Sequence, residues 1–249
     1  MKSFFGIAVT SALFPLAVGC QSGPTDADYD DVAASVAALT ANESGGDVGS
    51  MDDSIAAAQG ETPEGLTASG SGSFQGDRLG LEYEYAVTCL DEAGQTMAIC
   101  DSTTDSARLT VAWSGELTLP RYSASVSRTG DWTVTGLEDE TAQFDGEGTF
   151  DLQSEFQALF TDETRTANFS WDAEYEAIRF RVADGMPISG EARFAVHLER
   201  TRERGGRSVD AEFDIDGVLT IDGNGGATLV LDGSRSYHVD LATGAVEQE

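Results

Sequence analysis

The chain has 249 residues, with 44 acidic side chains against 14 lysines and arginines, and a formal net charge of −30 at pH 7. A field of this sign repels the phosphates of nucleic acids and the head groups of anionic lipids, so it argues against a nucleic-acid-binding protein and against a protein that lies flat on an anionic membrane. Solubility, a salty environment, a basic partner or a divalent cation would each account for the charge.

The first twenty residues have the organisation of an export signal. Lys2 supplies a short positive segment, and the apolar run that follows is too short to cross a bilayer as a helix of the mature protein. The run ends in LAVGC at residues 16–20, which resembles the lipobox of bacterial lipoproteins. Ala17 stands where that family more often has leucine.

This resemblance implies a processed and anchored protein. Residues 1–19 would be the signal peptide, and Cys20 would become the acylated first residue of the mature chain, carrying a fatty acid such as palmitate. Gln21 follows the cysteine where an aspartate would favour the inner membrane of enteric bacteria. The resemblance therefore implies a cell-envelope lipoprotein of the outer membrane, facing either the periplasm or the cell surface.

Residues 20–65 differ in composition from the rest of the chain. They are rich in alanine, glycine, serine and acidic residues, and the glycine pair at 45–46 and the TPEG stretch at 62–65 resemble flexible joints. A short helix is predicted over residues 30–40, where Val32, Val36 and Leu39 share one face and aspartates stand at the start. The segment is either a flexible acidic tether between lipid and domain or a helix that caps a hydrophobic mouth.

From residue 66 onward, apolar and polar residues alternate. The runs cover residues 81–89, 109–119, 150–160, 169–175, 188–198, 213–221, 229–231 and 237–241. This is the pattern of antiparallel strands with one face in water, and turns rich in aspartate and glycine separate the runs. About ten to twelve strands are expected. We predict an all-β domain over residues 66–249, a single antiparallel meander that forms a curved sheet, a sandwich or a partly closed barrel.

Two cysteines remain once Cys20 carries lipid. Cys89 and Cys100 lie in the β region of an exported chain, where such a pair usually forms a disulfide. In the chain-entropy model this bond would stabilise the fold by about 3 kcal/mol. A zinc site or a thiol redox pair is not indicated, because neither a set of further ligands nor a Cys-x-x-Cys spacing is present.

The sequence offers few groups for catalysis. Strand alternation places both histidines, His197 and His238, on the polar faces of their strands. Neither has a sequence neighbour that would make it a general base, and there is no Gly-x-Ser-x-Gly motif for a serine nucleophile. We therefore predict a protein that is not an enzyme.

One stretch could supply oxygen ligands to calcium, the single candidate cofactor. The candidate ligands are Asp214, Asp216, Asp222 and Asn224. Calcium prefers six to eight oxygens, and these residues would provide four. Their spacing is not that of an EF-hand, and Asp-Gly and Asn-Gly are also common hairpin turns, so a plain turn is the alternative.

Two more groups of residues stand out. Four arginines between residues 200 and 207 are interleaved with Glu199 and Glu203 at an expected hairpin tip. The arginines would either bind a partner or form surface ion pairs with these glutamates. A set of aromatic residues at alternating positions would line either a ligand pocket or the core. Its members are Trp113, Trp132, Phe150, Phe156, Phe160, Phe169 and Trp171.

Together these features favour a non-enzymatic, membrane-anchored envelope lipoprotein with a structural, adhesive or assembly role. It would contact the membrane through the lipid on Cys20 and bind a protein partner in the envelope, but not nucleic acid. The first alternative is a carrier of an apolar ligand such as a lipid, because lipid-transfer lipoproteins with unclosed antiparallel barrels and helical lids are similar in outline. The second alternative is a calcium-dependent adhesion or coat domain.

Overall fold

A computed structural model describes residues 23–249 except 44, 71, 79 and 159–162. The predicted signal peptide, the lipidation site at Cys20 and the aromatic Phe160 lie outside the described residues. The helices are α1 (Asp26–Thr40) and α2 (Asp47–Ala58). The strands are β1 (Leu66–Gly70), β2 (Ser73–Arg78), β3 (Leu81–Leu90), β4 (Ser106–Leu119), β5 (Tyr122–Thr135), β6 (Thr141–Gln157), β7 (Glu163–Arg181), β8 (Met186–Arg204), β9 (Arg207–Ile221), β10 (Gly226–Leu231), β11 (Arg235–Asp240) and β12 (Val246–Gln248).

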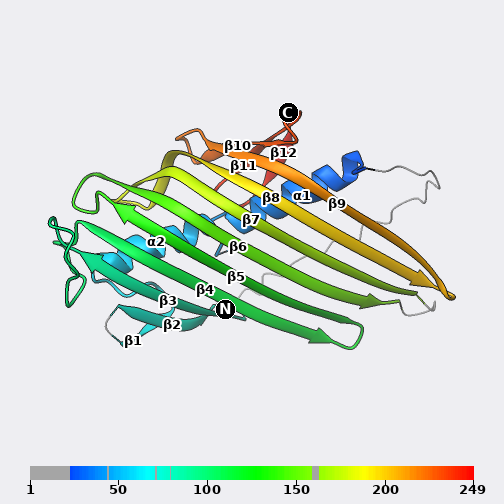
Figure 1. Cartoon of the computed structure of the whole chain (residues 1–249), viewed down its shortest axis with the longest axis horizontal. Helices are drawn as coiled ribbons and strands as arrows, with labels where there is room; N and C mark the ends of the chain where they lie inside the picture. The colour runs from blue at the N-terminus through cyan, green and yellow to red at the C-terminus, as the bar shows by residue number, and fades with distance from the viewer. Residues whose placement is uncertain (1–22, 44, 71, 79, 159–162) are drawn as a thin grey trace, which may run out of the picture.

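The strands form one antiparallel meander. Each described strand pairs with the next in the order β1 to β12, so β1 and β12 are the two edges of an open sheet. The sheet curves around the two helices (Figure 1). The predicted all-β meander is confirmed, and among the predicted shapes it is the curved, unclosed sheet that the chain adopts.

Both helices lie on the same, inner face of the sheet (Figure 1). Val36 of α1 and Met51 of α2 are buried in one core with strand residues such as Trp132, Phe144 and Leu219. Burial alternates along the strands, as in the pattern ieBeBeBeBi of β3, because successive side chains point to opposite faces. The inner face therefore forms the core, and the outer face is polar.

α1 begins at a capping box, in which the Thr25 side chain accepts from the Asp28 N–H and the Asp28 carboxylate accepts from the Thr25 N–H. The helix is longer than the predicted 30–40, and α2 follows it. Small residues such as Ala33 and Ala37 are fully buried, so the helix backbone can approach the sheet closely. Residues 26–58 of the expected tether thus contribute to the core. Neither described helix is long and apolar enough to cross a membrane.

A buried ion pair joins α2 to the middle of the sheet. Asp47, in the first turn of α2, pairs with Arg128 of β5, and both side chains are almost fully buried. The guanidinium carbon lies 5.7 Å and 5.8 Å from the ring centroids of Trp113 and Trp132. Burial lowers the pKa of Arg128 to about 10, so the side chain stays charged at neutral pH and needs its partner.

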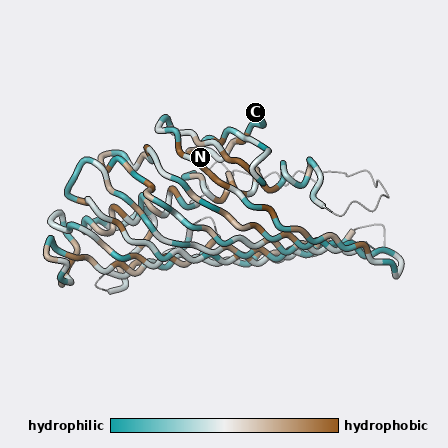
Figure 2. The backbone as a smooth tube through the Cα atoms, turned by 45° about the horizontal axis from the view of Figure 1, so that its top comes forward, coloured by the Kyte–Doolittle hydropathy of each residue, from teal (hydrophilic) through white to brown (hydrophobic). Residues whose placement is uncertain are grey.

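Three hairpins extend past the helices at one end of the sheet (Figure 1), which is the narrow end of the tube in Figure 2. The hairpins are β4–β5, β6–β7 and β8–β9. The strands β6, β7 and β8 are long, with 17, 19 and 19 residues. We call residues 117–124, 154–158, 163–167 and 200–211 the projecting end. It keeps the two-faced pattern of the sheet. The start of α1 meets its inner face at Arg200, and Leu119 and Phe156 are exposed.

Candidate functional site

The inner face of the projecting end carries exposed apolar side chains. Leu117, Leu119, Phe156 and Val209 are 49%, 52%, 44% and 61% exposed. The register runs continuously from buried inner residues such as Trp113 to these positions, so they continue the inner face of the same strands. An apolar surface that packs against helices elsewhere is therefore exposed here, with neither described helix over it.

These residues are adjacent in space. Leu119 pairs with Tyr122 across the β4–β5 turn, and Tyr122 pairs with Phe156 of β6. Leu117 lies next to this row, one inner position nearer the helices. We call Leu117, Leu119, Tyr122 and Phe156 the apolar patch.

Arginines continue the same face on β7, β8 and β9. Arg165 pairs with Arg202, and Arg204 pairs with Arg207 at the β8–β9 turn, all at inner positions of their strands. The sequence prediction of a hairpin tip for this basic group is confirmed by that pairing. Its interleaved glutamates, however, occupy outer positions, because neighbouring residues of a strand point to opposite faces. Strand geometry thus separates a basic inner face from an acidic outer face.

One carboxylate lies within this basic group. Glu163 at the start of β7 accepts from Arg165 Nε at 2.6 Å and from an Arg202 guanidinium nitrogen at 2.7 Å. These bonds hold the pKa of Glu163 at about 2, well below its ordinary value of 4.5. Glu163 fixes both guanidinium groups beside the apolar patch.

Arg200 connects the projecting end to the start of α1. Its guanidinium bonds the Asp28 carboxylate at 2.9 Å and the Asp31 carboxylate at 3.3 Å. Figure 1 shows α1 beginning on the side of the molecule where the hairpins end.

The four candidate calcium ligands are not brought together. Asp214 lies on the outer face of β9, 2.8 Å from Nδ1 of His197, and Asp216 lies two residues further along that strand. The Asp222 carboxylate accepts the N–H groups of Asn224 at 2.8 Å and Gly226 at 3.3 Å, which closes the β9–β10 turn. Eight residues of strand separate Asp214 from Asp222 by about 26 Å. One ion cannot contact both, and Asp222 and Asn224 act as turn residues.

The cysteine pair has the bond predicted for it. Cys89 and Cys100 form a disulfide with Cα atoms 5.5 Å apart. Cys89 is buried on the inner face of β3, and the loop that the bond closes connects β3 to β4. The disulfide lies at the end of the strands opposite the projecting end.

The aromatic set that the sequence singled out divides into two. Its buried members belong to the core, and they are Trp113, Trp132, Phe150, Phe169 and Trp171. Phe156 is the described member that is exposed, because it lies beyond the helices. Sequence alternation finds all these positions but does not show which of them a helix covers.

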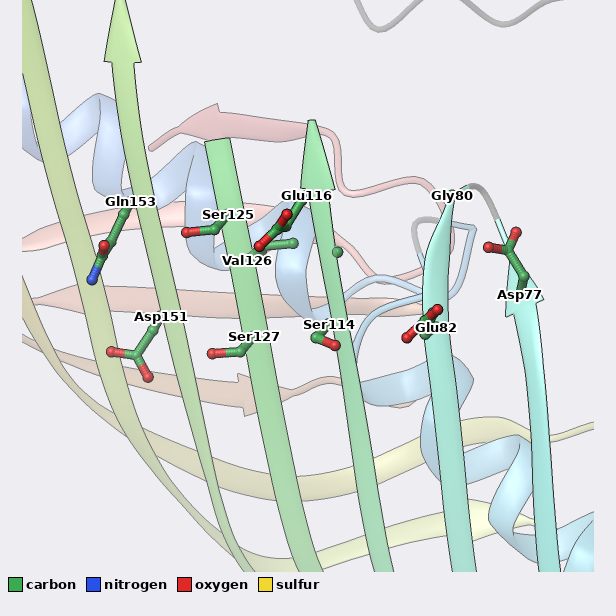
Figure 3. A pocket seen from close by; sticks show the side chains of 11 residues that line it. Asp77, Gly80, Glu82, Ser114, Glu116, Ser125, Val126, Ser127, Asp151 and Gln153 are labelled. Atoms are coloured by element: carbon green, nitrogen blue, oxygen red, sulfur yellow. The ribbon is translucent and has the colours of Figure 1, made fainter. Parts of the chain in front are cut away.

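The outer face has a shallow hollow of about 620 Å³ over β2 to β6. Figure 3 shows carboxylates and hydroxyls around it, with Glu82, Ser114, Ser127 and Asp151 in successive strands. These groups can bond water or a polar ligand. The contrast with the apolar inner face makes the projecting end, rather than this hollow, the more distinctive surface.

Comparison of the chain with protein-family models found no match, and comparisons with curated proteins and with solved structures likewise found none.

Proposed function

We propose that the protein is a non-enzymatic, membrane-anchored envelope lipoprotein, with a structural or assembly role, whose projecting end contacts the lipid surface. The observation that carries this proposal is the uncovered apolar patch beside four inner-face arginines, at the end where α1 begins. The lipid on Cys20 would be the anchor. The β-domain would stand on the membrane by its projecting end and present its acidic outer face to the envelope.

The chemistry of the patch fits a lipid interface. Each square ångström of apolar surface removed from water contributes about 25 cal/mol. Arginine keeps its charged head in the head-group layer while its stem lies against apolar groups, and each cationic side chain near an anionic surface contributes about 1 kcal/mol. The apolar patch and its neighbours Arg165, Arg202, Arg204 and Arg207 combine both contributions.

The overall charge of −30 does not oppose this orientation. Charges that lie farther apart than the Debye length, about 8 Å at physiological ionic strength, are largely screened. The acidic residues of the projecting end, such as Glu155, Glu203 and Asp210, occupy outer positions. The exception is Glu163, an inner carboxylate whose charge is paired with Arg165 and Arg202. An anionic membrane would still repel the acidic outer face, but contact through the basic inner face of one end avoids this repulsion.

The lipid anchor would strengthen a weak surface contact. A tether of a few residues converts association of the patch with lipid into an intramolecular step with a high effective concentration. The patch would then set the orientation of the domain, while the acyl group keeps the protein on the membrane.

The test uses the full lipidated chain in vesicles of phosphatidylethanolamine and phosphatidylglycerol. A nitroxide label is placed by Leu119→Cys at an inner position or by Thr118→Cys at the adjacent outer position, which is the matched control. We expect oxygen, which concentrates in lipid, to reach the label at 119 more readily than the label at 118. A water-soluble nickel complex should show the opposite preference. Equal accessibilities at the two positions would overturn the proposed orientation.

The anchor itself is tested by Cys20→Ser. The variant should move from the membrane fraction to the soluble fraction. If it still sediments with membranes after a high-salt wash, the lipid-anchor hypothesis is wrong.

The same patch favours a second candidate function, the carriage of an apolar ligand. Beneath α1 and α2 the inner face is filled by core side chains, so an acyl chain would lie at the projecting end. Native mass spectrometry of the detergent-purified protein separates the two functions. A single lipid-sized adduct beyond the covalent lipid supports a carrier, and the bare lipidated mass contradicts it.

A further inference from the structure

A second group of residues lies on the outer face of β8 and β9, away from the apolar patch. His197 and Glu199 are two residues apart on β8, and Glu212 and Asp214 are two apart on β9. In the register, His197 faces Asp214 and Glu199 faces Glu212. One ligand atom from each of His197, Glu199 and Glu212 lies within 4.8 Å of the others.

The imidazole is oriented for binding a metal ion. Its Nδ1 lies 2.8 Å from the Asp214 carboxylate. When Nδ1–H donates to that carboxylate, Nε2 carries the free lone pair, and it faces Glu199 at 3.6 Å. A carboxylate behind a histidine is the arrangement that fixes the tautomer and ring orientation of metal-binding histidines.

The carboxylates are also arranged for a cation. Asn168 of β7 donates to one oxygen of Glu199 at 3.1 Å, and the other oxygen lies toward His197. Glu199 and Glu212 are directly opposite each other on neighbouring strands, where like charges destabilise a sheet. A cation held between them would replace this repulsion with two attractive contacts.

We propose that His197, Glu199 and Glu212 form a binding site for a divalent transition metal ion with the ligand preferences of Zn²⁺. Asp214 and Asn168 are its positioning residues. One imidazole nitrogen and two carboxylate oxygens suit zinc, whereas calcium takes oxygen ligands alone. Water would complete the coordination, because the site is open to solvent. A bound ion would join β8 to β9 near the projecting end.

The test is calorimetric titration of the full lipidated chain, in detergent and freed of metal by a chelator, with zinc chloride. We expect one saturable site, a loss of affinity of at least tenfold in His197→Gln, and a loss of tenfold to a hundredfold in Asp214→Asn. His238→Gln is the matched control, since His238 is exposed on β11 and should leave the affinity unchanged. These side chains lie outside the core, so the circular dichroism spectra of the variants should match that of the wild type.

Electron paramagnetic resonance of the copper(II)-loaded protein gives a second readout. We expect coupling to one imidazole nitrogen, present in His238→Gln and absent in His197→Gln. Absence of saturable zinc binding in the wild type, wild-type affinity in His197→Gln, or a nitrogen signal that survives this substitution would overturn the proposal.

Discussion

Two phenylalanines of β6 show how the covered and projecting parts of the sheet differ. Phe144 and Phe156 lie on the same inner face of the same strand, yet Phe144 is fully buried and Phe156 is 44% exposed. The local pattern of apolar and polar residues is alike around both. The difference comes from α1 and α2, which cover one stretch of the inner face and leave the other open.

The cover is held in place by polar contacts as well as by packing. Tyr237 of β11 donates to the Asp30 carboxylate of α1 at 2.9 Å, and Tyr85 of β3 donates to Asp53 of α2 at 3.2 Å. Beneath α2 lies the buried pair of Asp47 and Arg128. At the projecting end the guanidinium groups of Arg165 and Arg202 are partly exposed, although the Glu163 carboxylate between them is buried. One region therefore contributes to stability, and we expect the other to act in contacts outside the chain.

The sharpest test of this difference is the same truncation in both regions. Phe144→Ala should destabilise the protein by about 4 kcal/mol, because it opens a cavity among Phe180, Trp132 and their neighbours. Phe156→Ala, its matched control, should cost less than about 1 kcal/mol, as substitutions of partly exposed residues usually do. Urea unfolding followed by tryptophan fluorescence measures both. Equal losses would mean that the projecting end is part of the stabilising core.

The buried ion pair gives the next largest effect. Asp47→Ala leaves the Arg128 charge without a partner in the core and should cost about 3 kcal/mol. The double substitution Asp47→Leu with Arg128→Met should recover much of this loss, because a buried pair can often be replaced by apolar residues of similar volume. Urea unfolding midpoints of the single and double variants check this. A double variant no more stable than Asp47→Ala would contradict the pairing.

The sequence predicts the sheet well because alternation is a local property. It identifies β3, β4 and β6 to β11 by their apolar residues, but not β1, β2, β5 or β12. The inner positions of β5 include Arg128 and Gly130. In β5 these two residues interrupt the apolar pattern of the inner face. Arg128 is nevertheless at an inner position, because its guanidinium group lies beside the Trp113 and Trp132 rings.

The two helices were harder to predict for a physical reason. Alanine, glycine and serine dominate residues 26–58, and this composition is also typical of linkers. In the structure the same small residues allow close contact with the sheet: Ala33, Ala37 and Ser54 are fully buried. Whether a segment of small residues packs or stays loose depends on the partner surface, which single-sequence periodicity does not describe.

The candidate sites depend on strand register. The arginines and glutamates of residues 199–204 appear mixed in the sequence, but alternation places them on opposite faces. The contact of His197 with Asp214 needs the pairing of β8 with β9, and the position of Arg200 beside Asp28 needs the path of α1. The sequence contains the residues of each site, while the register and the helix path bring them together.

The smallest expected effect concerns Glu163, a buried carboxylate held by two partly exposed arginines. Arg202 and Arg165 lower the pKa of this carboxyl to about 2 in the folded protein, from an ordinary value of 4.5. Because the folded-state pKa is the lower one, the contribution of Glu163 to stability is present above about pH 4.5 and is lost as the pH falls toward 2. Glu163→Gln should therefore reduce the slope of unfolding free energy against pH within this window.

Glu203→Gln provides the matched control, because Glu203 occupies an outer position on the neighbouring β8. It should keep the wild-type slope, measured by urea unfolding at a series of pH values. If the projecting end frays independently of the covered sheet, the Glu163 effect should appear instead in hydrogen exchange of the β7–β8 amides near Arg202, with the global slope unchanged. Either result supports the pairing of Glu163 with its arginines. If Glu163→Gln matches the wild type in both the pH slope and the hydrogen exchange, the cluster does not form in solution.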